Sequence, residues 1–81
     1  MRVRVRLFAS LREAAGRSEL EIDLPEPATA EDAWRRLAES FPSLASRRTS
    51  LAAAVNRRYA TFAHALAEGD ELVFIPPVSG G

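Results

Sequence analysis

The 81-residue sequence contains no cysteine, no lysine and only one histidine, His64. Without cysteine the chain has no disulfide, no thiolate metal site and no cysteine nucleophile. With one histidine it has no histidine-rich metal site of its own, and without lysine it forms no Schiff base. These absences leave few side chains for covalent or metal chemistry, and we expect this chain to bind no metal and no cofactor.

Long apolar runs are absent as well, and so is any excess of one charge. No run approaches the ~20 residues of a membrane span, and the alternating start Met1-Arg2-Val3-Arg4 lacks the apolar core of a signal peptide. The 11 acidic side chains balance the 11 arginines, whereas a domain that binds nucleic acid is usually basic. We therefore expect a cytoplasmic protein that binds neither membranes nor nucleic acid.

The residues that are present suit one small domain. The length fits a single domain, and the 47% apolar and 27% charged residues are ordinary for a globular protein. The arginines are clustered, since residues 1–12 and residues 40–58 each carry four arginines and no acid. Such basic segments are typical of solvated faces or of a docking surface for an acidic protein.

Alternating polar and apolar residues predict two strands near the N-terminus. In residues 2–8 the apolar positions alternate with arginines, until Phe8 places an aromatic ring on the arginine side. Residues 18–24 alternate in the same way, with acids in the polar positions. A short helical turn over residues 10–15, ended by Gly16, connects the strands. We expect an antiparallel pair in which the opposite charges face each other.

An amphipathic helix follows the second strand. Pro25-Glu26-Pro27 breaks the strand, Thr29 is a good N-cap, and apolar residues then recur at helical spacing until Pro42 ends the helix. Trp34 lies on the apolar stripe, which indicates a core residue rather than a binding residue. Residues 43–50 are polar and predict a loop.

The C-terminal half predicts short strands and one central strand. An alanine-rich strand at residues 51–56, a turn at residues 56–58 and a brief strand around Tyr59 precede a second turn at Gly69-Asp70. Residues 71–75 are apolar on both sides of the strand, which is typical of a central strand covered on both faces. We expect this strand to lie beside the first one.

This order of elements predicts an α+β fold of the β-grasp (ubiquitin-like) type, in which one main helix packs on one face of a mixed four- or five-stranded sheet. Residues 1–75 form the domain and residues 76–81 an extended tail. The second face of the sheet has no helix of its own, and Phe8, Val73 and Ile75 lie on or near it. An uncovered apolar patch on so small a domain is a candidate partner surface.

The tail has the most distinctive residue pattern of the sequence. Pro76-Pro77 is a stiff, extended segment without backbone donors, and Val78, Ser79, Gly80 and Gly81 follow it. Glycines without Cβ atoms can enter a narrow slot of another protein, although a frayed end is the alternative interpretation. The α-carboxylate at the end of the tail is a poor electrophile. Activation as an acyl-adenylate would allow its conversion to a thiocarboxylate, whose sulfur is nucleophilic.

Other candidates for catalysis are weak. His64 stands alone beside apolar residues and indicates a packed or turn residue. Asp70 and Glu71 are adjacent in a strand or turn, and adjacent strand residues point to opposite faces, which excludes a carboxylate pair. No serine has a histidine at the spacing of a catalytic triad. We therefore do not expect a self-contained enzyme.

Several segments together resemble one family. In chain order they are Phe8-Ala9-Ser10-Leu11-Arg12-Glu13, Ala54-Val55-Asn56, Gly69-Asp70-Glu71 and Pro76-Pro77-Val78-Ser79-Gly80-Gly81. This set, which spans nearly the whole chain, resembles the small subunits of molybdopterin synthase, a family of ubiquitin-like sulfur carriers. Arg57-Arg58 departs from the pattern, because a less basic pair is expected after Asn56.

The resemblance implies a reaction sequence. An activating enzyme would adenylate Gly81 with ATP and magnesium, and a sulfur donor protein would convert it to a thiocarboxylate. The tail would then enter the active site of the large synthase subunit, which supplies the catalytic residues, and pass its sulfur to a pyranopterin precursor during molybdenum cofactor biosynthesis. The expected assembly is a heterotetramer of small and large subunits, two of each.

The resemblance also implies site residues. Gly80 and Gly81 match the reactive end of the family. Phe8, Tyr59 and Ile75 match apolar positions of the subunit contact, and residues 76–79 (Pro76, Pro77, Val78 and Ser79) would accompany them in partner binding. Two alternatives stay open. One is a sulfur carrier of the same fold for thiamin synthesis or tRNA thiolation, and the other is a ubiquitin-like protein modifier.

Overall fold

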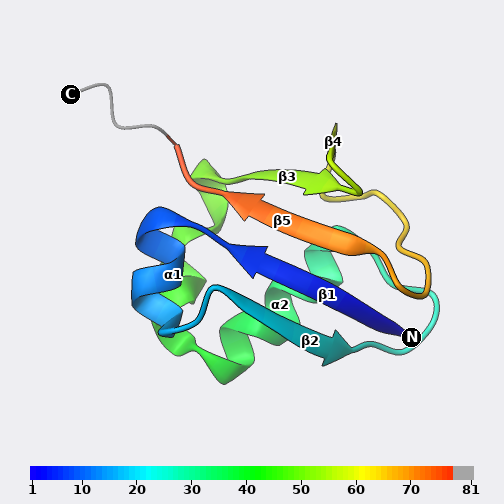
Figure 1. The fold of residues 1–81 in the computed structure, drawn as a ribbon, viewed down its shortest axis with the longest axis horizontal. Helices are drawn as coiled ribbons and strands as arrows, with labels where there is room; N and C mark the ends of the chain where they lie inside the picture. Colours follow the sequence, from blue (N-terminus) through cyan, green and yellow to red (C-terminus); the bar gives the residue numbers. More distant parts are fainter. Residues whose placement is uncertain (78–81) are drawn as a thin grey trace.

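A computed structural model describes residues 1–77 as a five-stranded sheet with helices on one side (Figure 1). The elements in chain order are β1 (Arg2–Leu7), α1 (Ala9–Ala15), β2 (Glu19–Asp23), α2 (Ala30–Ser40), the 3₁₀ helix η1 (Pro42–Ser50), β3 (Ala52–Val55), β4 (Arg58–Ala60) and β5 (Glu71–Ile75). The strand order is β2-β1-β5-β3-β4. This α+β arrangement confirms the predicted β-grasp fold.

The last strand is central, as predicted. β5 runs parallel to β1, with Leu72 opposite Val5, and antiparallel to β3, with Phe74 opposite Ala53. Leu72 and Phe74 are fully buried on the side of the helices. The parallel pairing of β1 with β5 brings residues from the two ends of the sequence side by side (Figure 1).

The antiparallel pairing of β1 with β2 is also confirmed. Arg2, Arg4 and Arg6 lie opposite Asp23, Glu21 and Glu19 in the register of the two strands. Arg2 Nε lies 3.2 Å from Asp23 Oδ1, and Arg4 Nε lies 3.2 Å from Glu19 Oε1. Opposite charges across the strands support this pairing, although pairs this exposed add little stability.

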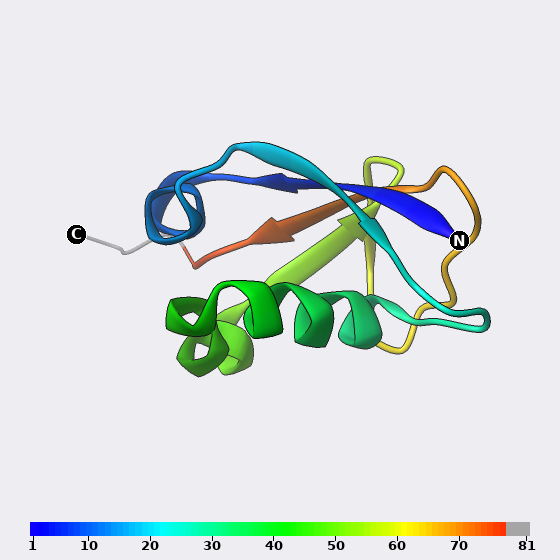
Figure 2. The same ribbon diagram turned by 90° about the horizontal axis from the view of Figure 1, so that it is seen from below.

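The helix α2 covers one face of the sheet. Thr29 and Asp32 form a capping box in which each side chain accepts a hydrogen bond from the other residue's backbone N–H, which satisfies donors at the helix start. The buried side of α2 carries Ala33, Trp34 and Leu37. Figure 2 shows α2 and η1 together on one side of the sheet, and within residues 1–77 no helix lies over the other side.

Three sequence-based expectations were wrong in detail. Residues 43–50 are not a loop but belong to η1, because Pro42 suits the first helical turn and Leu44 is fully buried beneath it. β5 is covered on one face only, because Val73 and Ile75 on its other side remain half-buried. The first strand ends at Leu7, so Phe8 lies just beyond it as the N-cap residue of α1.

A charged and aromatic cluster ties η1 to the core. The guanidinium of Arg48 donates through Nε and Nη2 to the carboxylate of Glu31, and it also lies over the ring of Phe62, 3.4 Å from the centroid. Phe62 stacks on Phe74 at 5.8 Å between ring centroids. This chain of contacts joins the surface ion pair to the central strand.

The Glu31–Arg48 pair makes stability depend on pH. The hydrogen bond from Arg48 lowers the pKa of Glu31 below its ordinary value of 4.5, so the pair stabilises the folded state above that pH. This contribution is lost as pH falls through the lowered pKa of the folded state. Arg48→Met removes the pair, so the variant's free energy of unfolding is expected to fall less steeply with acid than that of the unmodified protein. Urea unfolding from neutral pH to below 4.5 measures the two slopes, and equal slopes would contradict the role of the pair.

Trp34 tests the core directly. Trp34→Ala is expected to lower the free energy of unfolding by ~3–5 kcal/mol, since the indole is buried and packs edge-on against Phe74, 4.9 Å between ring centroids. Circular dichroism during urea unfolding measures the loss. Arg35→Ala, on the exposed side of α2, is the control and is expected to stay within about 0.5 kcal/mol. A loss no larger than the control's would place Trp34 outside the core.

Candidate functional site

The uncovered face of the sheet is charged near one edge and more apolar toward the other. The strand registers align one row of residues across it: Glu19, Arg6, Val73, Ala54 and Tyr59. The half formed by β2 and β1 is charged, and its arginines pair with acids. The half formed by β5, β3 and β4 presents Val73, Ile75, Ala54 and Tyr59, with the carboxylate of Glu71 at the start of β5.

Four residues form what we call the open-face patch: Phe8, Tyr59, Val73 and Ile75. Phe8 is 44% exposed and Tyr59 is 80% exposed, which makes them the exposed large hydrophobic residues of the described chain. Val73 and Ile75 are half-buried between them in the sheet. The guanidinium of Arg6 lies 5.6 Å from the centre of the Phe8 ring and borders the patch on its charged side. Exposed aromatic rings beside arginines are typical of protein interfaces.

The backbone beside the patch is strained. Within residues 1–77 three non-glycine residues have positive φ: Ala9 at 50°, Asn56 at 51° and Arg57 at 70°. Ala9 follows Phe8 directly, and Asn56 and Arg57 form the turn just before β4, which holds Tyr59. Left-handed backbone at residues with a Cβ is unfavourable, and such strain concentrates at functional sites.

A hydrogen-bond cluster holds the β3–β4 turn against the start of β5. The backbone N–H of Asn56 donates to the carbonyl of Glu71 at 2.8 Å, and the N–H of Glu71 donates to Asn56 Oδ1 at 3.0 Å. Asn56 Nδ2 donates to Asp70 Oδ1 at 2.9 Å, while Asp70 Oδ2 accepts from the N–H of Ala67 at 2.8 Å. The sequence reasoning missed this cluster, although asparagine in a two-residue turn was the available signal.

The tail begins at the end of β5. Pro76 is half-buried and Pro77 is exposed, and both follow Ile75 at the edge of the open-face patch. Val78, Ser79, Gly80 and Gly81, which the sequence proposes as the partner-bound and reactive end, lie outside the described residues. The structure thus brings Phe8, Ile75 and Pro76 to one end of the sheet, since β1 and the parallel β5 both end there (Figure 1). Tyr59 lies on the edge strand β4.

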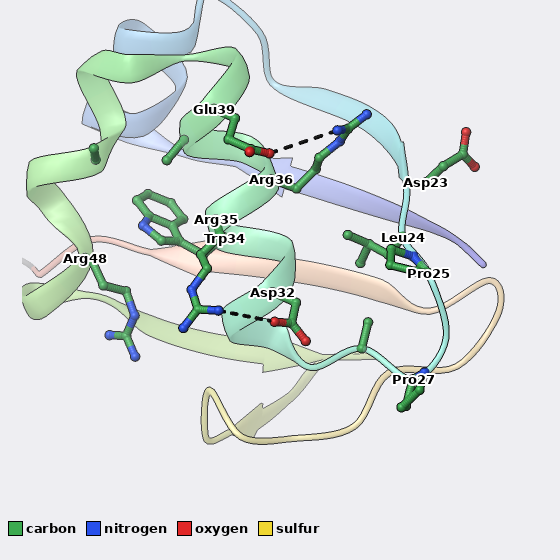
Figure 3. A pocket seen from close by; sticks show the side chains of 13 residues that line it. Asp23, Leu24, Pro25, Pro27, Asp32, Trp34, Arg35, Arg36, Glu39 and Arg48 are labelled. Carbon is green, nitrogen blue, oxygen red and sulfur yellow. Dashed lines mark ion pairs between the residues drawn. The ribbon is translucent and has the colours of Figure 1, made fainter.

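Outside the open-face patch, the described residues include an exposed histidine and a groove beside α2. His64 is exposed in the turn after β4, where its carbonyl accepts from the N–H of Ala30 at 3.1 Å. The groove beside α2 is lined by apolar residues such as Leu24, Pro25 and Ala38 together with charged ones, of which Arg35 pairs with Asp32 and Arg36 with Glu39 (Figure 3). Among residues 1–77 there is no cluster of three metal-ligating side chains, and no helix there is long and apolar enough to cross a membrane.

The fold and the open-face patch define a ubiquitin-like β-grasp protein whose last strand leads directly into its tail. The profile of the ThiS family matches residues 5–81. The chain therefore belongs to the ThiS family.

Relatives support this assignment over the full chain. The molybdopterin synthase sulfur carrier subunit of Arabidopsis thaliana is 37% identical, covering 98% of this chain and 82% of the relative. The subunit of the same name from Escherichia coli is 37% identical, covering 98% and 99%. Among solved structures, small archaeal modifier protein 1 from Haloferax volcanii matches with a TM-score of 0.91 and 35% identity over all of both chains.

The open-face patch can be tested by introducing a charge. Phe8→Asp is expected to weaken binding to a protein partner at least about tenfold, because the carboxylate would be desolvated in an apolar contact. Phe8→Leu keeps an apolar side chain and is expected to retain most of the affinity. Isothermal titration of the two variants against the large subunit of molybdopterin synthase makes the comparison. Equal affinities for both variants would remove Phe8 from the interface.

Proposed function

We propose that this protein is the sulfur-carrier small subunit of molybdopterin synthase. The observation that carries the proposal is the continuity of β5 with the tail: one strand supplies Val73 and Ile75 to the uncovered patch and then leads into Pro76-Pro77-Val78-Ser79-Gly80-Gly81. A partner bound to the patch would thereby receive the tail at a fixed point. The full-length similarity to sulfur carrier subunits from a plant and a bacterium supports the same role.

The chemistry resides at Gly81 and needs no side chain. An activating enzyme uses ATP and magnesium to convert the carboxylate of Gly81 to an acyl-adenylate with release of pyrophosphate, and a sulfur donor protein then supplies sulfur at the oxidation level of sulfide, which displaces AMP to leave a thiocarboxylate. The thiocarboxylate sulfur is a good nucleophile and displaces an oxygen substituent from a carbon of the pyranopterin precursor in the active site of the large subunit. Water then cleaves the resulting thioester, which leaves the sulfur on the pterin and restores the carboxylate of Gly81. Neither ATP nor magnesium is bound by this chain in the proposed sequence.

The composition of the chain suits this role. It has no cysteine that would compete for the sulfur, and no lysine side chain that would be acylated by its own activated end. The proposal assigns the catalytic residues to the large subunit. The proposal includes a heterotetramer with two copies of each subunit and a cytoplasmic location.

Deletion of Gly81 is the decisive test. The shortened chain still ends in glycine, but its carboxylate is displaced by one residue from the positions where the activating enzyme and the synthase act. We expect sulfur transfer to the pterin precursor to be abolished. The free energy of unfolding should be unchanged, because Gly81 lies beyond the folded elements that end at Ile75.

The measurement is the intact mass after incubation with ATP, the activating enzyme and a sulfur donor. The full chain should gain the mass difference of one oxygen-to-sulfur exchange, mapped to Gly81, and the deletion variant should not. Arg35→Ala, on the exposed side of α2, leaves the whole tail intact; it is the control and should still be converted. Normal sulfur transfer by the deletion variant would contradict the proposal.

A second function is favoured by one observation. The similarity in fold to small archaeal modifier protein 1 suggests a protein modifier, whose activated end would form isopeptide bonds to lysines of other proteins. That function predicts adducts of higher mass in cell extract, whereas the synthase subunit predicts co-purification of a large subunit. Co-purification of a thiamin or tRNA-thiolation enzyme instead would assign the same carrier chemistry to another pathway.

A further inference from the structure

Two adjacent arginines project from the turn between β3 and β4, next to the open-face patch. Arg57 occupies the second position of the two-residue turn, and Arg58 is the first residue of β4. Both are exposed, and the side chain of Arg57 is 84% exposed. Tyr59, the most exposed aromatic residue of the described chain, follows them directly. Arginine and tyrosine are the residue types that most often dominate binding energy at interfaces.

The backbone at Arg57 favours a different residue. Positive φ at both Asn56 and Arg57 (51° and 70°) defines a type I′ turn, whose second position strongly prefers glycine. An arginine there carries a conformational cost that glycine would not. The hydrogen bonds of Asn56 to Asp70 and Glu71 account for the first position of the turn, but they do not use the side chain of Arg57.

The fold makes little use of the two guanidinium groups. Arg57 Nε lies 3.7 Å from Glu71, whose carboxylate is shared with Arg6 at 3.9 Å. Arg58 forms no ion pair within residues 1–77. By contrast, Arg2 and Arg4 each lie 3.2 Å from an acid of β2, so the charge of the β1 half is matched within the chain. Arg6 and Arg57 thus share one carboxylate on the open face. Arg58 lies opposite Val55, which is buried on the helix side, so it leaves the edge strand toward the other face and carries its charge at the rim of the sheet.

We propose that Arg57 and Arg58 recognise carboxylate side chains on the surface of the large subunit, beside the apolar contact of Tyr59. This inference rests on the proposed function and extends it by naming the chemistry of the partner surface. A cationic turn at the edge of an apolar patch is the arrangement of a polar interface rim. The neutral overall charge of the chain favours an acidic protein over nucleic acid, which is bound by domains with a net basic charge.

The contact should act mainly through long-range attraction. Exposed charges on an interface rim accelerate association and select between partners, and salt screens them over a distance of about 8 Å at physiological ionic strength. The affinity for the large subunit should therefore fall as the salt concentration is raised. Removing the charges of Arg57 and Arg58 should make this salt dependence smaller.

A pair of double variants tests the proposal. Arg57→Gln with Arg58→Gln removes the two charges from the turn. The matched control, Arg35→Gln with Arg36→Gln, removes two adjacent exposed arginines from α2, which covers the opposite face of the sheet (Figure 2). Each double variant lowers the net charge of the chain by two. Binding to the purified large subunit, at low and at high salt, is measured by biolayer interferometry with the full-length chain.

We expect the turn variant to bind about tenfold more weakly at low salt and to lose much of the salt dependence, while the control stays within about twofold. Equal affinities and salt slopes for the two double variants would overturn the inference and leave the proposed function standing. Failure of the unmodified chain to bind the large subunit would overturn both. Binding of the unmodified chain to transfer RNA that is lost in the turn variant would assign the arginines to nucleic acid instead.

A single substitution separates binding from folding. Arg57→Gly relieves the strained backbone, so the melting temperature should be no lower than that of the unmodified chain. The affinity for the large subunit should nevertheless fall several-fold, mainly through slower association. An Arg57→Gly chain that binds with unmodified affinity would show that Arg57 makes no contact with the partner.

Discussion

The place of β5 between β1 and β3 is the constraint on which the rest of the structure depends. Leu72 and Phe74 are fully buried, and the ring of Phe74 contacts those of Trp34 and Phe62. A shift of β5 by one residue would turn these side chains toward solvent, so their burial sets the register against both neighbouring strands. The same register brings Val73 and Ile75 to the open face. The core and the proposed partner surface are therefore the two sides of one strand.

A chain of this size can cover only one face of its sheet. The 11 residues of α2 extend about 16 Å, and together with η1 they bury the side of the sheet that carries the core. A small domain buries a smaller fraction of its surface than a large one, and among the described elements no helix covers the second face. The open-face patch follows from this limit, and we infer that a partner protein covers it when the tail is delivered.

Local patterns predicted most of the elements but fewer of the contacts between them. Alternation predicted β1 and β2 and placed their charges opposite each other, and Thr29 as an N-cap residue predicted the start of α2. Residues 43–50 were predicted as a loop because their polarity is visible in the sequence. What makes them helical is the burial of Leu44 and the contacts of Arg48 with Glu31 and Phe62, which come from distant parts of the chain.

Some features of the candidate site were predicted from the sequence and others were not, for the same reason. Phe8 was identified because it breaks the alternation of the first strand, and Ile75 because β5 is apolar on both sides. The positive φ of Arg57 was not predicted, because it depends on the hydrogen bonds that hold the turn of Asn56 against Asp70 and Glu71. Such contacts appear only when the β3–β4 turn and the start of β5 meet in the folded sheet.

The residues with strained backbone lie beside the proposed binding surface. The three non-glycine residues with positive φ in residues 1–77 all lie within three positions of Phe8 or Tyr59, and none lies in the core. Since the proposed chemistry at Gly81 uses a main-chain carboxylate, it places no demand on side chains near the patch. The hydrogen bonds of Asn56 to Asp70 and Glu71 account for its conformation, and we relate the remaining strain, at Ala9 and Arg57, to recognition of a partner. A carrier whose reactive group is common to its family needs exposed side chains to distinguish its own partner, and the turn of Arg57 and Arg58 is where this chain offers them.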